Sequence, residues 1–461
     1  MEESPQSLNQ THGHVLVVAF PTQGHVGPLM KLAHQIANHG IKVTFVTTEF
    51  VLSKMATSSP EVGGENKQVK LVSVPDGLEP EDDRKDQSKM TQKISEVMPG
   101  HLEDLIKKTN QLGSNDKITG VIADNALGWA LEISGKMGIK GGLYWCSSPG
   151  CLALTNNIPK LIEDKVIGID GTQLTNKKIQ ISPIMPAMST AEFTWHFPGD
   201  PIMQKGMFQY IKSLVPYMKS SNWLICNWFH DLDPSACDLN PNVLSIGPLQ
   251  AAGQIAGSMC SEDFDCLNWL DNQPARSVIY AAFGSTSKFS QNQIDELAMG
   301  LELVDRPFLW VAWSGLTDGL SLRYPEGFTE RVANRGKMVE WAPQEMVLAH
   351  PSIACFLTHC GWNSTMESVS RGVPFLCWPY FGDQLYIQTC IRDAWKVGLS
   401  LERDENGIIS RHEIKQKLEE LLSNAGIREN VVKLKEMARK SVGKGGSSSK
   451  NFENLVEQMR G

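Results

Sequence analysis

The sequence predicts an α/β fold in which two Rossmann-like domains face each other across a cleft. Short apolar runs alternate with helical segments in the first half of the chain, and the alternation returns in the second half. Such alternation is typical of parallel, doubly wound sheets. The stretch between the halves, 247–263, is rich in small residues and lacks an apolar face, so it is predicted to be an interdomain linker. With 461 residues, the chain is long enough for two domains of about 200 residues each.

Residues 1–246 are expected to form the N-terminal domain. Its strands are predicted at the apolar runs 14–20, 41–47, 69–74, 119–123, 141–145, 223–226 and 243–246. Helical spacing predicts helices over 26–39 and 127–137, and Gly40 suits the left-handed position after the first of them. Residues 164–205 lose this periodicity and are rich in Ile, Met, Pro and Phe.

Residues 264–442 are expected to form the C-terminal domain. Its strands are predicted at 278–283, 308–313, 338–340, 354–357 and 374–377. A Gly/Ser-rich break at 443–449 precedes a short helix at 451–460. Ligands of such sheets bind beyond the carboxyl ends of the strands, so the functional residues are sought there.

Bulk composition narrows the class of protein. A net charge of −8 disfavours nucleic acid and anionic membranes as partners. The polar, acidic first dozen residues do not resemble a signal peptide, and no apolar segment is long enough for a membrane span. The ten cysteines form no CxxC pair, so reduced thiols are expected rather than disulfides or a zinc site. Together these features predict a cytoplasmic protein.

The stretch 341–384 combines features of a nucleotide site. Its apolar run 354–357 leads into a turn that opens a helix, and a helix N-terminus offers free N–H groups to a phosphate. Gly361 allows close approach of the backbone, while Asn363 and Ser364 add side-chain donors. Trp341 offers a flat face on which a base can stack.

Three polar side chains in the same stretch suit a sugar. Glu367, one turn into the helix, can accept hydrogen bonds from ribose hydroxyls, and Asp383 with Gln384 can hold the hydroxyls of a hexose. Each residue alone is commonly structural, as a helix cap or a solvated face. Because all of these residues occur together at this spacing, the stretch predicts a nucleotide-sugar site.

A second candidate site lies in the first half. His25 follows the first strand, and Asp124 ends the strand 119–123. A carboxylate bonded to one imidazole nitrogen fixes the tautomer and stabilises the imidazolium, which makes the histidine a good general base. Spacing alone leaves the structural alternative open, since Asp124 also suits an N-cap.

At these residues the chain resembles the plant UDP-dependent glycosyltransferases. The stretch 341–384 is similar to their signature box in its WAPQ opening, its HCGWNS core, its Glu367 and its Asp-Gln close. The PTQGH turn at 21–25 and the Phe-Gly-Ser loop at 283–285 also resemble family motifs. The resemblance implies a GT-B fold and a role in plant secondary metabolism. It also implies a helix at 443–461 that packs back on the N-terminal domain.

The activity implied by the resemblance is inverting, metal-independent transfer of a hexose from a UDP-sugar. The acceptor would be a hydroxyl of a small lipophilic molecule, such as a phenolic, a flavonoid or a terpenoid, and the product a β-glycoside. No cofactor or metal is expected, because the UDP-sugar is a co-substrate. The partners are therefore UDP-glucose and a small acceptor, and a monomer is expected.

The resemblance also assigns residues. His25 is the general base and Asp124 its partner. The donor is expected to contact Gly284, Ser285, Trp341, Ala342, Gln344, His359, Gly361, Trp362, Asn363, Ser364, Glu367, Asp383 and Gln384. His359 and the turn after it are placed to stabilise charge on the leaving phosphate, and Gln384 favours glucose as the donor sugar.

Family acceptors bind mainly to the N-terminal domain, between irregular loops. The acceptor candidates are Gly24, Tyr144, Met188, Phe193 and Trp195. Met-rich, aromatic loops suit an adaptable apolar pocket. Ordinary anchoring of the loops against the core remains open as the alternative.

Three other classes were considered. A non-catalytic nucleotide-sugar binding protein would keep the signature box but could dispense with His25 and Asp124, which are both present. A Rossmann dehydrogenase needs a Gly-rich turn after its first strand, whereas 21–24 offers one glycine. A two-carboxylate glycosidase is the remaining enzyme class.

Overall fold

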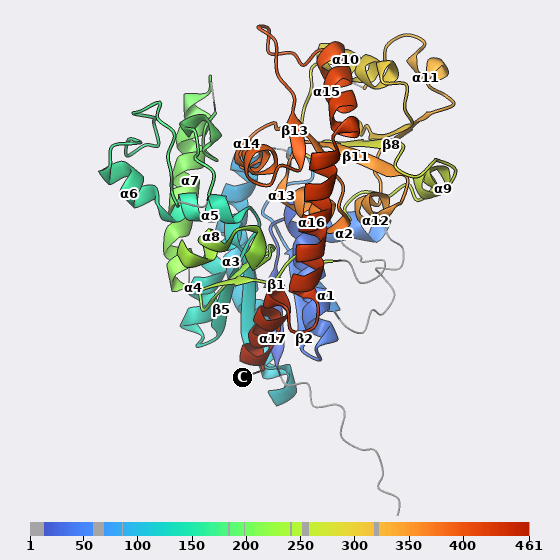
Figure 1. The fold of residues 1–461 in the computed structure, drawn as a ribbon. Helices are drawn as coiled ribbons and strands as arrows, with labels where there is room; N and C mark the ends of the chain where they lie inside the picture. Colours follow the sequence, from blue (N-terminus) through green and yellow to red (C-terminus); the bar gives the residue numbers. More distant parts are fainter. Residues whose placement is uncertain are drawn as a thin grey trace, which may run out of the picture.

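The computed structural model describes residues 13–58, 69–84, 86–182, 185–197, 199–239, 242–250, 258–317 and 322–460. These residues form two parallel sheets, one in each half of the chain. Figure 1 shows the first sheet below the second, with helices around both sheets and with α7 of the first half rising at the upper left. The predicted α/β fold with two Rossmann-like domains is confirmed.

The first sheet has seven strands in the order β3-β2-β1-β4-β5-β6-β7. The strands are β1 (His14–Val18), β2 (Lys42–Thr48), β3 (Val69–Val74), β4 (Gly120–Asp124), β5 (Lys140–Trp145), β6 (Trp223–Cys226) and β7 (Val243–Ser245). All neighbours pair in parallel, and β1 lies between β2 and β4. Each strand overlaps its predicted run, because apolar residues buried on both faces make these runs hard to mistake.

Eight α-helices accompany this sheet among the described residues. They are α1 (Gln23–Asn38), α2 (Glu49–Ser58), α3 (Gln87–Gln111), α4 (Trp129–Lys136), α5 (Pro149–Asn156), α6 (Ile158–Glu163), α7 (Pro201–Ser220) and α8 (Pro234–Leu239). Helix α1 begins at Gln23, earlier than predicted, because Thr22 in extended conformation already serves as its N-cap residue. His25 therefore stands on the first turn of a helix rather than in a loop.

The second sheet has six strands in the order β10-β9-β8-β11-β12-β13. They are β8 (Val278–Ala282), β9 (Phe308–Val311), β10 (Gly336–Val339), β11 (Ile353–Thr358), β12 (Phe375–Cys377) and β13 (Gly398–Ser400). The surrounding helices are α9 (Asp265–Asp271), α10 (Gln291–Leu303), α11 (Phe328–Arg331), α12 (Gln344–Ala349), α13 (Trp362–Arg371), α14 (Gln384–Thr389), α15 (Arg411–Ser423) and α16 (Ala425–Val442). The edge strand β13 was not predicted, since three residues give too little pattern.

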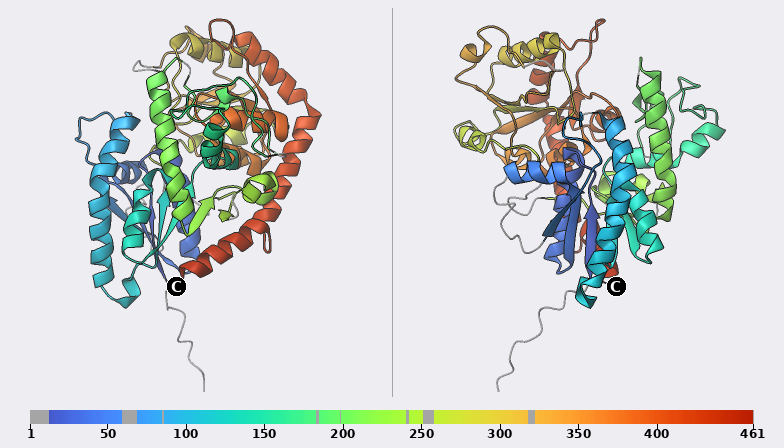
Figure 2. Two further views of the ribbon diagram at one scale, coloured as in Figure 1. Left: turned by 90° about the vertical axis from the view of Figure 1, so that its left-hand side faces the viewer. Right: turned by 180° about the vertical axis from the view of Figure 1, so that it is seen from behind.

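The last helix, α17 (Ser447–Met459), lies against the first sheet. Figure 2 shows α16 descending from the second half and α17 turning under the first. The Trp223 indole N–H donates to Gln458 Oε1 at 2.8 Å, and the Ser448 hydroxyl donates to the carbonyl oxygen of Gly247 at 2.6 Å. The middle of the predicted linker, 251–257, lies outside the described residues.

The carboxyl ends of the central strands in the two sheets open toward each other. The loops that follow β1, β4 and β5 meet those that follow β8, β11 and β12, and together they border a cavity of about 2180 Å³. None of the helices in the described part of the chain combines the length and apolar character needed to cross a membrane.

Candidate active site

The cavity collects fifteen of the twenty site residues that the sequence singles out. Its walls include Gly24, His25, Gly284, Ser285, Trp341, Ala342, Gln344, His359, Gly361, Trp362, Asn363, Ser364, Glu367, Asp383 and Gln384. Two of these come from the first half and the others from the second. The cavity therefore lies between the two domains, as the cleft of the predicted fold requires.

His25 and Asp124 form a pair at the end of the first sheet. Strands β1 and β4 are parallel neighbours, with Val18 opposite Ala123, so the segments that follow them meet at one edge. His25 Nδ1 lies 2.7 Å from Asp124 Oδ2, and the carboxylate is fully buried. The other oxygen, Oδ1, accepts the N–H of Ala126 at 2.8 Å and caps the following turn. One carboxylate thus makes both of the contacts weighed for it from the sequence.

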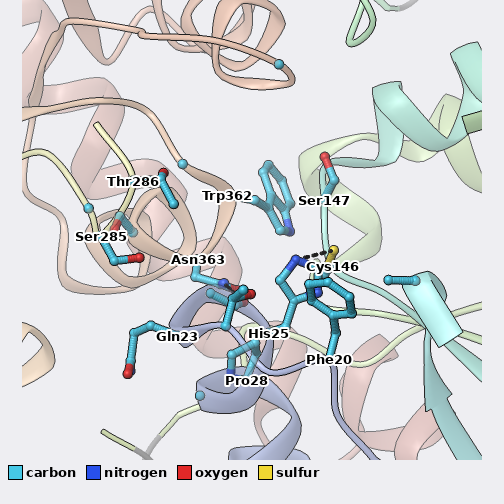
Figure 3. Close-up of a pocket in the computed structure, with 18 of the residues that line it drawn as sticks. Phe20, Gln23, His25, Pro28, Cys146, Ser147, Ser285, Thr286, Trp362 and Asn363 are labelled. Atoms are coloured by element: carbon cyan, nitrogen blue, oxygen red, sulfur yellow. Dashed lines mark hydrogen bonds between the residues drawn. The ribbon is translucent and has the colours of Figure 1, made fainter. Parts of the chain in front are cut away.

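The His25 ring presents its second nitrogen, Nε2, to the cavity. Figure 3 shows this nitrogen directed at Cys146, whose Sγ lies 3.9 Å away, with Phe20 beside the ring. Ser285, Thr286 and Trp362 of the second half lie across the same space. An acceptor hydroxyl placed at Nε2 would therefore face the donor half.

Two opposing effects act on the pKa of His25. Burial lowers it, but the charge of Asp124 raises it, with Cys146 adding to the rise. The net result is a pKa well above the usual 6.5. The ring is therefore a stronger base than free imidazole, and its pKa lies closer to that of the hydroxyl it would deprotonate.

His359 follows β11 and is enclosed by glycines. A Cβ added at Gly284 would come 2.7 Å from His359 Nε2, and one added at Gly361 would come 2.4 Å from the same atom. Gly284 also has a φ of +71°, which other residues rarely adopt. Both glycines are thus needed for the ring to lie between the β8 loop and the start of α13.

Burial lowers the pKa of His359 to about 4, although a hydrogen bond with the backbone of Ala282 opposes the shift. The imidazole is therefore neutral near pH 7, and its Nδ1 is buried without a partner among the described residues. It can serve the leaving phosphate as a hydrogen-bond donor rather than as a cation. The fixed positive potential comes instead from the N-terminus of α13.

The expected ribose ligand, Glu367, belongs to a hydrogen-bonded cluster. The amide of Gln344 donates to Glu367 Oε2 at 2.9 Å and to Ser364 Oγ at 2.8 Å. The Tyr280 hydroxyl donates to Gln344 Oε1 at 3.2 Å, which holds the amide in this orientation. The residues assigned to one end of the donor are thus already connected to one another.

At the other end of the expected donor site, Asp383 reaches the first half. The Ser147 hydroxyl donates to Asp383 Oδ2 at 2.5 Å, and burial raises the pKa of this carboxyl. The Gln384 side chain makes a hydrogen bond close to it in the sequence, because its Oε1 accepts the backbone N–H of Tyr380 at 2.7 Å. The Trp362 indole N–H donates to the carbonyl oxygen of Asn227 at 3.0 Å.

Four acceptor candidates lie away from the cavity. Tyr144, Met188, Phe193 and Trp195 are buried to 1% exposure or less within hydrophobic cores. In strand β5 the alternation of side chains sends Tyr144 into the core and leaves Trp145 in the cavity wall. Of the acceptor candidates, the structure brings Gly24 to the cavity.

The apolar wall on the acceptor side comes instead from α7. Its cavity-lining side chains include Met203, Met207, Tyr210 and Leu214, spaced as one face of a helix. Their helical spacing is a signal in the sequence, but α7 begins within the segment 164–205, where no periodicity was predicted. Lys31 and Glu345 also line the cavity, and no local signal in the sequence marks them.

No cluster of His, Cys, Asp and Glu side chains suited to a metal ion occurs within the described ranges. The ten cysteines, all of which fall in those ranges, are free thiols.

The structure has two Rossmann-like domains. A histidine–carboxylate pair on one domain faces, on the other, a helix N-terminus suited to a nucleotide phosphate. This arrangement defines a glycosyltransferase of the GT-B type. Comparisons with known proteins agree. The family model described as UDP-glucoronosyl and UDP-glucosyl transferase matches residues 206–441. UDP-glycosyltransferase 83A1 of Arabidopsis thaliana is 40% identical over 459 residues, covering 97% of each chain. The protein belongs to the plant UDP-dependent glycosyltransferase family, whose members transfer sugars from UDP-sugars to small acceptors.

Solved structures show the same relationship. UGT71G1 of Medicago truncatula, complexed with UDP-glucose, is 26% identical, with a TM-score of 0.81 and coverage of 97% of this chain and 98% of that one. A UDP-glucosyltransferase from Polygonum tinctorium, described as capable of glucosylating indoxyl, is 26% identical, with a TM-score of 0.82 and coverage of 97% and 99%.

Proposed function

We propose that the protein transfers glucose from UDP-glucose to a hydroxyl of a small, mainly apolar acceptor, with inversion at C1. The observation that carries the proposal is the His25–Asp124 pair, whose Nε2, beside Cys146 Sγ, lies in the cavity wall across from Ser285 and Trp362. The signature residues on the opposite wall support a UDP-sugar as donor. The complex of UGT71G1 with UDP-glucose supports glucose as the sugar.

The proposed reaction is a single displacement. His25 Nε2 removes the proton of the acceptor hydroxyl as its oxygen forms a bond to C1 of the sugar. The bond from C1 to the β-phosphate oxygen breaks, and its electron pair leaves with UDP. Attack from the face opposite to the leaving group converts the α-linked donor into a β-glycoside.

Each end of this reaction has residues suited to it. Asp124 stabilises the imidazolium that forms, and it keeps the proton of the resting tautomer on Nδ1. The neutral His359 and the first turn of α13 can donate hydrogen bonds to the departing phosphate. None of the steps requires a metal ion or a cofactor.

The apolar face of α7 supports a lipophilic acceptor. Met203, Met207 and Leu214 present flexible apolar side chains, and Tyr210 adds an aromatic one. A phenolic, a flavonoid or a terpenoid alcohol would suit such a wall, and the Polygonum enzyme is described as acting on indoxyl. We further propose that the protein acts in the cytoplasm as a monomer, with domains bounded at 246, 263 and 442.

Release of UDP with three donors and three acceptor classes tests the proposal. We expect UDP-glucose to be preferred over UDP-galactose and UDP-glucuronic acid, with a flavonoid, simple phenol or triterpenoid as acceptor. The coupling constant of the anomeric proton in the product then reports the linkage. An α-glycoside, or tight UDP binding without transfer to any acceptor of the panel, would contradict the proposal.

A further inference from the structure

Lys31 lies on α1 of the first half, yet its ammonium group reaches the expected ribose site of the second half. Lys31 Nζ lies 2.7 Å from Glu367 Oε1, and it also pairs with Glu345 at the start of α12. The three side chains are only 14–16% exposed, so solvent screens the two ion pairs weakly. Figure 1 shows α12 and α13 at the lower edge of the upper half, next to the half that carries α1.

The surroundings of this ammonium group are acidic. Glu262 lines the same part of the cavity as Glu345 and Glu367. Burial raises the pKa of Glu262, and the negative charges of Glu345 and Glu367 raise it further, which shows that the three carboxyl groups interact. The UDP part of a donor brings additional negative charge, so an acidic wall at this place would oppose binding unless a cation offsets it.

Lys31 also determines how Glu367 is oriented. Its ammonium group takes one carboxylate oxygen, Oε1, while the Gln344 amide takes the other, Oε2. With both oxygens held, the rotamer of Glu367 is fixed, and the remaining lone pairs are available to ribose hydroxyls. Because Lys31 belongs to the opposite domain, residues of both domains hold this orientation of Glu367.

We propose that Lys31 is a positioning residue of the donor site, contributed by the acceptor domain. It offsets the acidic charge at the ribose end and orients Glu367, so that the acceptor domain contributes to the affinity for UDP-sugars. The inference rests on the proposed function in that Glu367 is taken as the ribose ligand.

Burial lowers the pKa of Lys31, but Glu367 and Glu345 together hold it above its usual value. The ammonium group therefore stays protonated and does not act as a base. A role in binding rather than in proton transfer follows from this charge state.

Replacing Lys31 by Met keeps the length of the side chain and removes its charge. In Lys31→Met we expect the Kd for UDP and the KM for UDP-glucose to rise about 10-fold to 100-fold. The kcat at saturating donor should stay within about three-fold of the wild type, and the KM for the acceptor should not change. Lys415→Met is the matched control, because it removes an equal charge from an exposed pair with Glu419 on α15.

The double variant Lys31→Met/Glu345→Gln restores the charge balance of the cluster. We expect the double variant to bind UDP about five-fold or more tightly than Lys31→Met does. If the role of Lys31 were purely structural, the second substitution would be neutral or harmful. Lys31→Arg, which keeps the charge, provides the second variant if Lys31→Met does not fold, and it should bind UDP more tightly than the Met variant.

Calorimetric titration with UDP separates this inference from the proposed function, since it needs no turnover. A Kd within about two-fold of the wild type in Lys31→Met would overturn the inference, as would a fall in kcat and melting temperature without a change in Kd. A wild-type protein that binds UDP but transfers no sugar would overturn the proposed function alone.

Discussion

The cleft holds one histidine on each side, and the two have opposite environments. His25 follows a strand of the first sheet, and His359 follows a strand of the second. Both rings are taken largely out of water, which by itself lowers the pKa of a histidine. His25 has a buried carboxylate at 2.7 Å and ends with a raised pKa, whereas His359 has no charged partner and ends near 4.

This contrast shows that the neighbouring charge, not burial, separates the pKa values of the two histidines. A histidine beside a carboxylate can gain a proton during a reaction and hold it. A histidine enclosed by glycines and backbone stays neutral and can only donate or accept hydrogen bonds. The same residue type thus suits proton transfer on the acceptor side and leaving-group stabilisation on the donor side.

The largest effect is expected from removing the imidazole of His25. His25→Ala should lower kcat by about 10⁴-fold, because the acceptor hydroxyl loses its base. The Kd for UDP, measured by calorimetry, should stay within about two-fold, since His25 is not expected to contact the nucleotide. His412→Ala, an exposed histidine at the start of α15, is the control and should keep the wild-type rate. Activity near the wild-type level in His25→Ala would show that His25 is not the base, and the contrast between the two histidines would then have no bearing on proton transfer.

Removing the charge next to His25 should have the next largest effect. Asp124→Asn should lower kcat by about 10³-fold, because the imidazolium loses its stabilising partner. The pKa of His25 falls when this negative charge is removed, so the acid limb of the kcat/KM profile should move to lower pH. A pH–rate series on both proteins tests this. An unchanged limb would mean that Asp124 does not set the pKa.

On the donor side, crowding His359 should weaken binding of the nucleotide. Gly361 has an ordinary φ of −62°, so Gly361→Ala leaves the backbone unstrained and acts only through its Cβ, which would lie 2.4 Å from the imidazole. We expect the Kd for UDP to rise about 10²-fold. Gly100→Ala on α3, where no atom lies within 4 Å of the added Cβ, should bind UDP as the wild type does. Equal affinity in both variants would show that the ring position is unimportant.

The smallest effect concerns stability rather than rate. The folded-state pKa of His359 is depressed to about 4, so its contribution to stability is present above the unfolded value of 6.5 and is lost as the pH falls toward 4. By pH 5 the wild type should lose about 2 kcal/mol more than His359→Gln, which carries no titrating group. Denaturant unfolding at pH 7 and pH 5 measures the difference. Parallel losses in both proteins would indicate that the pKa of His359 is not depressed in the folded state.

The sequence predicted well those features that depend on local pattern. Strands buried on both faces, the turn that opens α13 and the residues of the signature box all stand out within short windows. The place of His25 beside Asp124 also followed, because parallel neighbours in a doubly wound sheet bring their carboxyl ends together. The roles assigned to these residues stay predictions until the variants are measured.

Contacts between the two halves could not be predicted. Lys31 and Glu367 are 336 positions apart, and nothing near either residue indicates the other. Four of the acceptor candidates lie away from the cavity for a different reason. Trp195 packs with Phe193 and with Phe208 of α7, so the irregular segment covers the core beneath this helix while the helix itself lines the cavity. Composition identified an apolar surface but not the direction in which it faces.

The return of α17 to the first sheet has a consequence for exchanging parts between relatives. Phe452, Leu455, Val456 and Met459 belong to the same hydrophobic core as β1 and β2. A chimaera joined only at the middle of the chain would therefore combine the tail of one parent with the sheet of another. Hybrids that also take their last helix from the parent of the first half should be recovered from expression in better yield than hybrids that do not.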